Sequence, residues 1–478
     1  MNMRVKTQDS YGLFINGEWI VKKQRDSVLN KYTQEVMAET SIVNEKDVSK
    51  AVESAKAAFK LPFSMYDRYE VLLKVASLLR ENEEEFAQTI AAEVGKPITE
   101  ARGEVGRSAL TLENSAEEAK RIHGEGIPVE AAPGSERRKA FTRRHPVGVV
   151  AAITPFNVPL NLVCHKVGPA IAAGNSVVLK PDEKTPISAL LLAKLFEDAG
   201  LPKGKLNVLT GKGDVVGPLL TDNQDIDMFT FTGSPRVGQL IREQSGIRNV
   251  SLELGNNSAT VVHHDAEVSH AAKLVAQKSF NNAGQVCISV QRVYVHEDIY
   301  DEFLNNAVSA TENINQGDPL DPSTQVGPMI AEQEAIRVER WVNEAVEQGA
   351  VIQVGGERNG VFYRPTILTN IDEEMKVCRQ EVFGPVVAIT TYKNECEVID
   401  KVNDSDYGLQ AGLFTNDLNF ALKAAEEIHV GGLIVNDTAG YRVDHMPYGG
   451  VKKSGTGKEG PKYAIEEMTE EKLIIFNN

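Results

Sequence analysis

The spacing of hydrophobic residues changes along the chain and predicts a series of helices and strands. Between residues 67 and 94, apolar side chains recur at steps of three and four residues, which predicts an amphipathic helix. From residue 147, short apolar runs alternate with helical patterns, and the predicted elements are 147–154, 162–174, 175–181, 188–200 and 206–211. Gly174 and Gly200 are expected to end the two helices among them. Short β-branched strands between helices indicate a parallel sheet with helices on its faces.

A second series of the same kind begins after residue 250 and predicts a second α/β domain. Its expected strands are 258–264, 289–296, 384–392 and 431–437, and its expected helices are 268–280 and 331–348. The stretch 124–143 is different, because glycines and prolines divide it into short segments, and it is expected to form a projecting hairpin. Residues 472–476 form a strand pattern with no neighbouring sheet in the sequence. One hypothesis is that this strand pairs on a neighbouring subunit.

Composition and charge exclude several classes of protein. The 478 residues are 42% hydrophobic and 25% charged, which is typical of a chain with a substantial core, in three domains or in two large ones with an appendage. The net charge of −16 argues against a nucleic-acid partner, because phosphate binding needs clustered Lys and Arg. The sequence shows no signal-peptide pattern and no apolar stretch of about 20 residues. No membrane partner is therefore expected, and a cytoplasmic location is predicted.

The spacing of cysteines and histidines does not indicate a metal site. The four cysteines are far apart and form no CxxC pair, which argues against a disulfide framework or a cysteine zinc site. The nine histidines lack HxxxH and HExxH spacing. His263, His264 and His270 are expected on a strand end and a helix face rather than around a metal. The sequence therefore predicts no metal cofactor.

The segment 280–289, Phe-Asn-Asn-Ala-Gly-Gln-Val-Cys-Ile-Ser, is the most suggestive candidate for chemistry. A predicted helix ends in Asn-Asn-Ala-Gly, and the following loop presents Cys287 before the next strand. A cysteine nucleophile must react as the thiolate, which N–H donors or a nearby cation favour and apolar burial disfavours. The alternative is that Cys287 is an ordinary small buried residue.

Two further stretches carry groups that would assist a nucleophile. Glu253, within 250–257, lies at the end of a predicted buried strand, where burial raises a carboxyl pKa and suits it to general-base catalysis. Asn157, within 154–159, follows the first strand of the parallel series, at the edge where ligands collect, and its amide can donate to an oxyanion. The alternatives are a solvent-facing carboxylate and a turn asparagine between two prolines.

A fourth stretch, residues 229–238, is suited to phosphate binding. It joins a strand to a helix whose first residue is Pro235, with Gly233 and Ser234 at the junction. Free N–H groups at a helix N-terminus bind phosphate, and a serine adds a hydroxyl. The alternative is simple helix capping. The nearest approximation to the dinucleotide fingerprint GxGxxG is 211–217, which has one residue too many.

In this order, the four stretches resemble those of NAD(P)-dependent aldehyde dehydrogenases, and the resemblance covers nearly the whole chain. Three further stretches agree with that family: 179–186 (LKPDEKTP), 381–386 (EVFGPV) and 447–455 (PYGGVKKSG). The resemblance implies an α/β fold with two Rossmann-like parallel-sheet domains and a small β element for oligomerisation into a homodimer or homotetramer. The implied parts are an NAD-binding domain (1–123 and 144–252), a catalytic domain (253–448), and an oligomerisation hairpin and tail strand (124–143 and 464–478).

The resemblance also implies roles for individual residues. Cys287 matches the nucleophile, Glu253 the general base, and Asn157, together with the Cys287 backbone N–H, the oxyanion donor. The implied NAD-binding residues are Thr154, Pro155, Phe156, Lys180, Glu183, Gly213, Gly233, Ser234, Leu254, Glu381 and Phe383. The implied reaction is attack of the thiolate on an aldehyde, hydride transfer to the nicotinamide, and hydrolysis of the thioester by water that Glu253 activates.

Two departures from the family pattern affect the cofactor and the turn beside the base. A carboxylate at Glu183 would repel a 2′-phosphate and favours NAD, whereas Arg236 stands where many relatives have Glu and leaves NADP as an alternative. Asn256 and Asn257 replace the commoner Gly-Lys, which is expected to alter the turn without removing the base.

The substrate is expected to be a small aldehyde with an anionic or hydroxyl group, of the lactaldehyde or semialdehyde type. Val286 and Ile288 flank Cys287 with apolar walls. Arg107 and His445 fall in regions that line the substrate funnel of similar proteins, and both are suited to receive an anion. The alternatives are a surface salt bridge and a loop residue. The rival functions are a CoA-acylating dehydrogenase, against which Glu253 argues, and an idle binding protein, against which the intact catalytic set argues.

Overall fold

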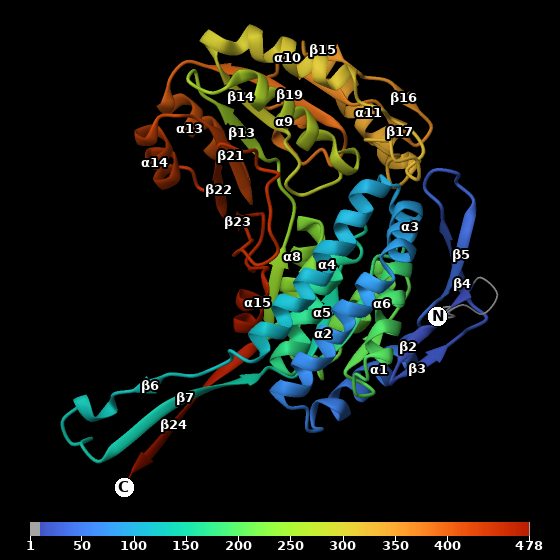
Figure 1. The fold of residues 1–478 in the computed structure, drawn as a ribbon, viewed down its shortest axis with the longest axis vertical. Helices are drawn as coiled ribbons and strands as arrows, with labels where there is room; N and C mark the ends of the chain where they lie inside the picture. Colours follow the sequence, from blue (N-terminus) through green and yellow to red (C-terminus); the bar gives the residue numbers. More distant parts are fainter. Residues whose placement is uncertain (1–9, 478) are drawn as a thin grey trace.

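The computed structural model describes residues 10–477 and contains two seven-stranded sheets, one above the other in Figure 1. In order across the sheet, the first consists of β12 (Asn249–Glu253), β11 (Met228–Thr232), β8 (Val149–Ile153), β9 (Ser176–Lys180), β10 (Leu206–Val208), β2 (Leu13–Ile15) and β3 (Glu18–Ile20). The strands from β12 to β10 are parallel, and β2 and β3 add an antiparallel hairpin at one edge. The parallel strands therefore all end at one edge, which collects the segments that follow them.

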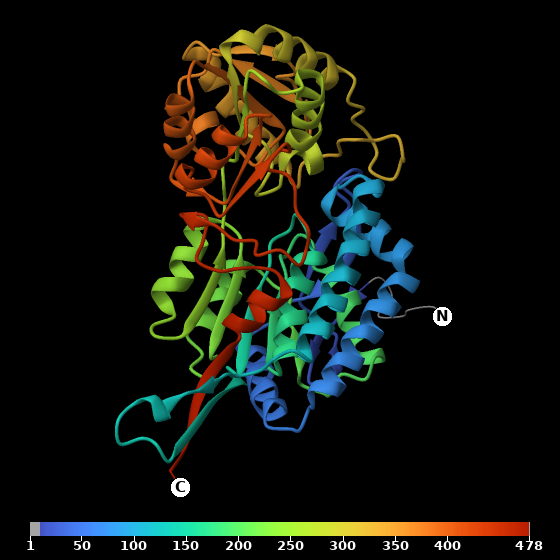
Figure 2. The same ribbon diagram turned by 60° about the vertical axis from the view of Figure 1, so that its left-hand side comes forward.

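Helices cover both faces of this sheet (Figure 2). One face packs against α2 (Met65–Glu81), α3 (Glu83–Val94), α4 (Ile98–Ala119), α5 (Asn161–Ala173) and α6 (Ile187–Asp198); the other packs against α1 (Glu45–Phe59), α7 (Gly213–Thr221) and α8 (Pro235–Gln244). Along β8, Val150 and Ala152 enter one core, whereas Val149, Ala151 and Ile153 enter the other. Burial on both faces explains the continuous apolar runs and confirms the predicted parallel sheet.

The prediction of one helix over 67–94 is wrong, because α2 and α3 are separate helices that meet at Asn82. Asn82 has φ −111° and ψ 21°, outside the helical region, and its Nδ2 donates to the Leu78 carbonyl oxygen at 2.7 Å. The acidic residues 83–85 then fill the first turn of α3, where negative charge stabilises a helix N-terminus. The buried residues of both helices belong to one core, so the apolar spacing continues through the break and does not reveal it.

The second sheet has the same architecture and confirms the second predicted α/β unit. Its strands, in order, are β15 (Val351–Val354), β18 (Thr366–Thr369), β19 (Val386–Tyr392), β14 (Arg292–His296), β13 (Ala259–Val262), β21 (Gln410–Phe414) and β22 (Gly432–Val435). One core contains α9 (Val268–Phe280), α10 (Tyr300–Glu312) and α11 (Glu332–Glu347), and the other contains α13 (Glu395–Asn403) and α14 (Leu418–Glu427). The strands from β18 to β22 are parallel, and β15 is antiparallel.

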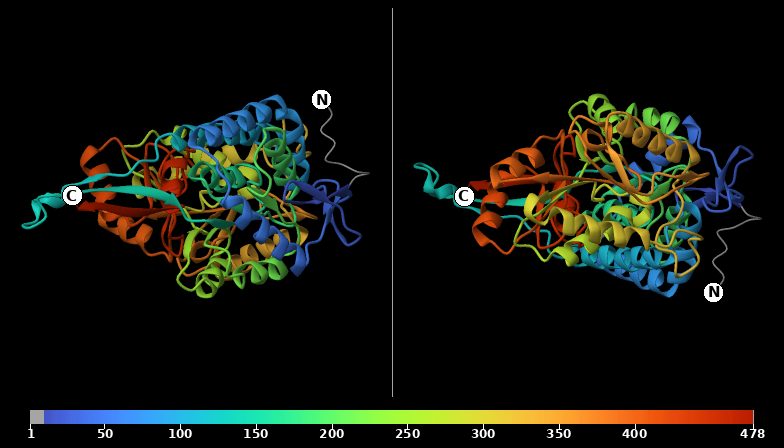
Figure 3. Two further views of the ribbon diagram at one scale, coloured as in Figure 1. Left: turned by 90° about the horizontal axis from the view of Figure 1, so that it is seen from below. Right: turned by 90° about the horizontal axis from the view of Figure 1, so that it is seen from above.

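A third sheet projects from the body of the protein and overturns one hypothesis (Figure 3). The predicted hairpin consists of β6 (Gly126–Ile127) and β7 (Arg138–Pro146). The tail strand β24 (Thr469–Asn477) pairs antiparallel with β7 over its whole length, so its partner lies in the same chain and not on a neighbouring subunit. Sequence separation hid this pairing, because 322 residues lie between the two strands, from 147 to 468.

The remaining elements are short. They are β1 (Ser10–Tyr11), β4 (Arg25–Leu29), β5 (Val36–Ser41), β16 (Arg358–Asn359), β17 (Phe362–Tyr363), α12 (Lys376–Arg379), β20 (Tyr407–Gly408), β23 (Val451–Lys452) and α15 (Pro461–Glu467). Within residues 10–477, no helix has both the length and the apolar character needed to cross a membrane.

Candidate active site

A strained turn precedes Cys287. After α9 ends at Phe280, three consecutive residues adopt positive φ: Asn282 (48°), Ala283 (54°) and Gly284 (70°). Alanine rarely occupies this region, and such strain is concentrated at functional sites. A side chain at position 284 would lie 2.1 Å from the carbonyl oxygen of Gly384, so glycine is needed for the two loops to approach. The turn thus brings the Cys287 loop against the loop that follows Glu381.

The Cys287 thiol is half-buried and contacts a tyrosine. Its Sγ lies 2.9 Å from the hydroxyl oxygen of Tyr448, and both side chains belong to a small apolar cluster. Burial raises the pKa of Cys287 to about 11, although the Tyr448 hydrogen bond and the positive charge of Arg442 oppose the rise. The raised pKa favours a thiol in the resting protein, so the thiolate that reacts must form by loss of a proton. Tyr448 lies in the stretch 447–455, and its position in the sequence gives no sign of this contact.

Asn157 lies against the same loop from the other sheet. Its Nδ2 donates to the Gln285 carbonyl oxygen at 2.8 Å, and the Asn157 carbonyl oxygen accepts from Nδ2 of Asn282 at 3.2 Å. An amide nitrogen carries two hydrogens, so one remains for a further acceptor. Asn157 is 4% exposed and its Oδ1 has no hydrogen-bond partner. The structure thus brings the predicted oxyanion donor next to the predicted nucleophile loop.

Glu253 ends β12 as a buried carboxyl group without hydrogen bonds. It is 3% exposed, and neither carboxyl oxygen has a partner. Burial and repulsion by Glu459 raise its pKa well above the usual range, and the positive charges of Lys166 and Arg442 oppose that rise. A side chain added at Gly449 would lie 3.0 Å from Glu253 Oε1, so this glycine leaves room for the carboxyl group. The prediction of a buried carboxyl group with a raised pKa is confirmed.

A buried ionic cluster surrounds these groups, and the sequence did not reveal it. Arg442 donates from Nη2 to Glu459 Oε2 at 2.7 Å, and Lys166 Nζ lies 3.7 Å from Glu459 Oε1. Although burial opposes ionisation, Arg442 and Lys166 lower the pKa of Glu459 to about 2. The Arg442 guanidinium also lies 3.8 Å from the centre of the Tyr448 ring. The cluster therefore keeps two cations near Glu253 and Cys287.

Two carboxylates on α4 hold the loops that carry these groups. Glu100 Oε1 accepts from the backbone N–H of Asn282 at 3.4 Å. One turn further along, Glu104 Oε1 accepts from the N–H of Leu160 at 3.0 Å, just after the Asn157 loop. Both contacts satisfy N–H groups that would otherwise be buried without a partner. One face of α4 therefore fixes the loops from both sheets.

The residues predicted to bind the adenosine ribose lie together. Lys180 Nζ is 2.9 Å from Glu183 Oε2. A side chain on Gly213, at the start of α7, would lie 3.6 Å from Lys180 Nζ and 4.0 Å from Glu183 Oε2, so glycine keeps this space open. Although burial opposes ionisation, Lys180 keeps the pKa of Glu183 below its usual value. A carboxylate and an ammonium facing an open space fit the hydroxyl groups of a ribose.

The predicted phosphate segment forms a capped helix N-terminus. Ser234 is the N-cap of α8, and its Oγ accepts from the Val237 N–H at 3.4 Å. The Gly233 N–H donates to the carbonyl oxygen of Glu253 at 3.0 Å, which ties this junction to the end of β12. Leu254 follows Glu253, and its side chain packs against Gly238 in the first turns of α8. The capping alternative is therefore realised, and the remaining N–H groups of this turn suit an anion.

Aromatic residues from the two sheets face each other where a nicotinamide is expected. The Phe156 and Phe383 rings are edge to face with centroids 5.8 Å apart, and Phe383 has a strained φ of 47°. Next to them, Glu381 Oε1 accepts from the Asn256 N–H at 2.9 Å, and burial raises the pKa of Glu381 to about 7.

Thr154 and Pro155 precede Phe156 at the end of β8. The Thr154 hydroxyl is buried without a hydrogen-bond partner. Together with the open space at Gly213, this unpaired hydroxyl shows that the residues present fit a bound dinucleotide.

The predicted substrate residues differ in their contacts and in their burial. Arg107 donates from Nε and Nη2 to the Asp444 carboxylate at 3.0 and 2.7 Å, so the salt-bridge alternative is realised while Nη1 remains available. His445 is exposed, Ile288 is buried beside Tyr448, and Val286 is half-buried in the same apolar cluster. The elements around Cys287 thus include those of Arg107, Val286 and Ile288. His445, in contrast, is exposed.

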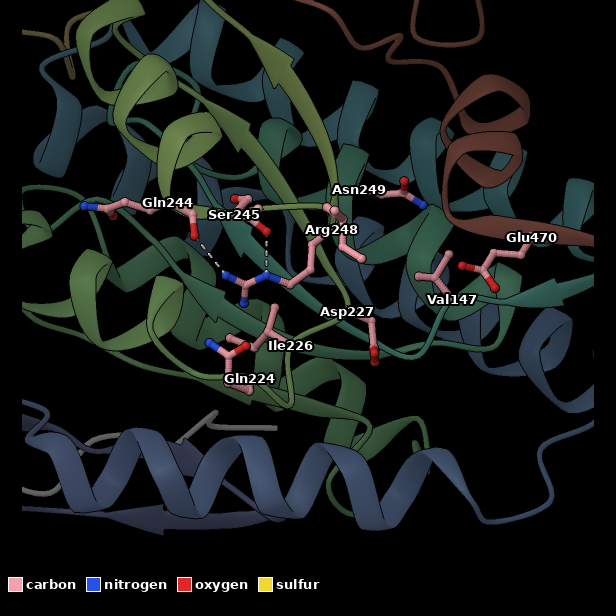
Figure 4. Close-up of a pocket in the computed structure, with 11 residues that line it drawn as sticks. Val147, Gln224, Ile226, Asp227, Gln244, Ser245, Arg248, Asn249 and Glu470 are labelled. Carbon is pink, nitrogen blue, oxygen red and sulfur yellow. Dashed lines mark hydrogen bonds between the residues drawn. The ribbon is translucent and has the colours of Figure 1, made fainter.

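A surface hollow of about 610 Å³ lies apart from these residues (Figure 4). It is at the opposite edge of the first sheet, where β11 and β12 begin. There Arg248 donates to the carbonyl oxygens of Ser245 and Gln244 at 2.9 and 3.2 Å, which closes the turn. None of the predicted site residues lines this hollow.

The sequence and the fold of this chain are similar to those of known proteins. A sequence model of the aldehyde dehydrogenase family matches residues 19–474. A 3-sulfolactaldehyde dehydrogenase from Priestia aryabhattai is 68% identical over 467 residues, which cover 98% of both chains. Aldehyde dehydrogenase 21 from Physcomitrella patens, solved with the reaction product succinate, has 38% identity and a TM-score of 0.96 over 99% of both chains. A glyceraldehyde-3-phosphate dehydrogenase from Methanocaldococcus jannaschii, solved with NADP, has 41% identity and a TM-score of 0.91 over 96% of this chain and all of its own.

The raised pKa of Cys287 predicts a steep pH dependence of its reactivity. Only the thiolate reacts with iodoacetamide, so the rate at Cys287 should rise about tenfold per unit from about pH 7 to about pH 9. Tyr448→Phe removes the hydrogen bond that lowers this pKa and should slow alkylation about tenfold at each pH. Peptide mass spectrometry separates Cys287 from the exposed Cys396, whose rate serves as the internal control. A rate at Cys287 that is flat over this range would show that the thiol is already ionised.

Proposed function

The chain belongs to the aldehyde dehydrogenase family, and we propose that it oxidises a short hydroxyaldehyde with an anionic group, of the 3-sulfolactaldehyde type, to the carboxylate. It is an NAD(P)-dependent aldehyde dehydrogenase. The observation that carries the substrate proposal is the 68% identity, over 98% of both chains, to a 3-sulfolactaldehyde dehydrogenase. The other two relatives described above also involve short anionic compounds. The Physcomitrella patens enzyme was solved with the dicarboxylate succinate as its reaction product, and the Methanocaldococcus jannaschii enzyme is named for a phosphorylated aldehyde.

We propose that Cys287 is the nucleophile. Its sulfur adds to the aldehyde carbon, and the carbonyl electron pair moves to oxygen to give a thiohemiacetal. The free hydrogen on Asn157 Nδ2 and the Cys287 backbone N–H stabilise that oxyanion. Bound NAD(P) supplies the hydride acceptor. Loss of hydride leaves a thioester on Cys287, and water then cleaves its carbon–sulfur bond to release the carboxylate.

We propose that Glu253 moves the protons in both halves of this reaction. Its raised pKa makes it a base that can take a proton from the Cys287 thiol and later from the attacking water. A fully ionised carboxylate with an ordinary pKa would be a weaker base toward either group. Lys166 and Arg442 limit the rise in pKa, so the carboxylate form remains accessible.

The residues we propose for the cofactor follow the edge of the first sheet and the facing loop. Lys180, Glu183 and Gly213 would hold the adenosine ribose; Gly233 and Ser234 the pyrophosphate; Thr154, Pro155, Phe156, Leu254, Glu381 and Phe383 the nicotinamide half. The ionised Glu183 supports NAD as the preferred cofactor, because its charge opposes a 2′-phosphate. Residues 1–123 and 144–252 would form the nucleotide-binding domain, and 253–448 the catalytic domain.

We propose that Arg107 binds the anionic group of the substrate and that His445 lies at the rim of the substrate funnel. The Arg107 side chain is 41% exposed, and Asp444 holds its guanidinium in place through Nε and Nη2, which leaves Nη1 for a sulfonate or carboxylate. Asp444 is itself fixed by Nδ2 of Asn161 at 2.9 Å and by Nε2 of His165 at 3.0 Å. Arg107 thus presents a preorganised cation instead of a free surface side chain.

We also propose that the chain assembles into a homodimer or homotetramer through the hairpin β6–β7 and the tail strand β24. Phe141, Leu473, Ile475 and Phe476 are exposed apolar residues on this small sheet, with exposed fractions of 38% to 53%. Apolar side chains on a projecting sheet favour burial against another protein surface.

The proposed reaction predicts NADH formation from 3-sulfolactaldehyde without coenzyme A. One carboxylate should appear for each NADH, and Cys287→Ala should abolish turnover while NAD still binds. A strict requirement for coenzyme A would overturn the hydrolytic reaction in favour of an acylating one. The assay is NADH absorbance combined with product analysis, run in parallel with NADP and with neutral lactaldehyde.

Arg107→Gln should weaken binding of the anionic substrate specifically. Loss of one charged hydrogen bond should raise KM for 3-sulfolactaldehyde about tenfold, because such bonds contribute about 1.5–3 kcal/mol. Lactaldehyde lacks the sulfonate, so its KM should change less than twofold, which makes it the matched control. Equal changes for both aldehydes would instead assign Arg107 to the support of Asp444 alone.

Leu473→Asp combined with Ile475→Asp should lower the molecular mass in solution toward that of one chain. Sedimentation velocity measures the change, and Leu61→Asp is the matched control because Leu61 is 55% exposed on a different surface. An unchanged mass in the double variant would contradict the proposed role of the tail strand.

A further inference from the structure

Three histidines gather at the edge of the second sheet that is remote from Cys287. His263 and His264 directly follow β13, and His296 is the last residue of β14. The two strands are parallel neighbours, so their ends meet at the same edge. The Glu253 and Cys287 segments precede the beginnings of β13 and β14 and therefore lie toward the other edge. The histidine cluster is thus separate from the site described above.

The side chains converge closely enough to share one ion. A ring nitrogen of His263, a ring nitrogen of His264 and a carboxylate oxygen of Asp265 all lie within 4.8 Å of one another. The rings of His263 and His264 have centroids 4.2 Å apart, and the His296 ring is 5.1 Å from that of His264. Imidazole nitrogens with one carboxylate are a ligand set that suits first-row transition ions, zinc among them.

Hydrogen bonds with neighbouring groups orient these side chains, in the way that hydrogen bonds orient the ligands of metal sites. Nδ1 of His263 is 2.7 Å from the hydroxyl oxygen of Tyr392, the last residue of β19. If Nδ1–H donates there, the other ring nitrogen keeps its lone pair for a metal. The Asp265 carboxylate accepts from the Thr415 hydroxyl at 3.0 Å and from the Asn416 N–H at 2.9 Å, both in the segment after β21. Contacts from the ends of β19 and β21 therefore hold the side chains that follow β13 in place.

The three histidines line a hollow of about 350 Å³. The two lysines in its lining are already paired with carboxylates. Lys423 Nζ lies 3.1 Å from the Glu395 carboxylate, and Lys393 Nζ lies 3.9 Å from that of Glu297. Their charges are therefore compensated by carboxylates.

We propose that His263, His264 and Asp265 form a binding site for a divalent transition ion such as Zn²⁺, with His296 at its side. The hollow gives the ion access from solvent, and the fixed partners hold the ligands in place. The site lies at the carboxyl edge of a parallel sheet, between β13 and β21, where the chain order across the sheet reverses. The ion would stabilise this edge of the catalytic half and take no part in aldehyde oxidation.

The sequence argued against a metal here, and the reason is geometric. The usual motifs place two histidines on one helix face, whereas these ligands follow a strand and are completed by packing against other strands. The competing interpretation is that the rings simply pack around Tyr392 as a structural cluster.

Calorimetric titration of the metal-free protein with ZnCl₂ separates the two interpretations. In the Cys287→Ala background, which removes the catalytic thiol as a zinc ligand, we expect one ion per chain. His264→Ala should weaken binding at least about tenfold. His264 is exposed, so its loss should leave the fold intact, which circular dichroism checks. His429→Ala, at another exposed histidine, is the matched control and should bind as its parent does.

Anomalous diffraction at the zinc edge locates the ion directly. A peak between His263, His264 and Asp265 supports the site, and Asp265→Asn should weaken or abolish it. In an otherwise unaltered chain, His264→Ala should leave NADH formation unchanged but remove the rise in melting temperature that zinc produces. The site is overturned if no ion binds, or if binding is as tight in His264→Ala as in its parent.

Discussion

One face of helix α4 makes three side-chain contacts on which the geometry of the site depends. Glu100 accepts from the turn before Cys287, Glu104 accepts from the backbone after Asn157, and Arg107 binds the Asp444 carboxylate. The residues are spaced by four and three, so they share one face of the helix. Each contact reaches a different segment of the chain. A single rigid helix therefore sets the distances between loops that come from both sheets.

The electrostatics of the site oppose ionisation of Cys287 and Glu253, the proposed nucleophile and the proposed base. Burial raises the pKa of both Cys287 and Glu253, whereas Glu459 is ionised because Arg442 and Lys166 compensate it. The buried negative charge is thus placed on Glu459, and its repulsion adds to the rise in the pKa of Glu253. Such an arrangement favours the thiol form of Cys287, the proposed nucleophile, in the resting protein. Activation then requires a proton transfer rather than a permanent thiolate.

Much of the fold was predictable from the sequence, for identifiable physical reasons, and the sequence also indicated candidate residues that the structure brings together around Cys287. Strands such as β8 are buried on both faces and therefore appear as continuous apolar runs, and Gly174 ends α5 in the left-handed conformation that glycine favours. The break at Asn82 and the pairing of β24 with β7 were not predictable, because one leaves the apolar spacing unchanged and the other joins distant segments. Tyr448, Arg442 and the histidine cluster gain their surroundings only through tertiary packing.

In the proposed reaction, Cys287 carries the substrate as a thioester which Glu253 helps to hydrolyse. Mass spectrometry of the protein after mixing with aldehyde and NAD tests this directly. Glu253→Gln is used to slow hydrolysis, and mixing continues until the slower acylation of this variant is complete. We expect an acyl adduct on the Cys287 peptide that accumulates in Glu253→Gln, stays low in the unaltered enzyme and is absent from Cys287→Ala. NADH formation by Cys287→Ala, or an adduct on a different residue, would contradict it.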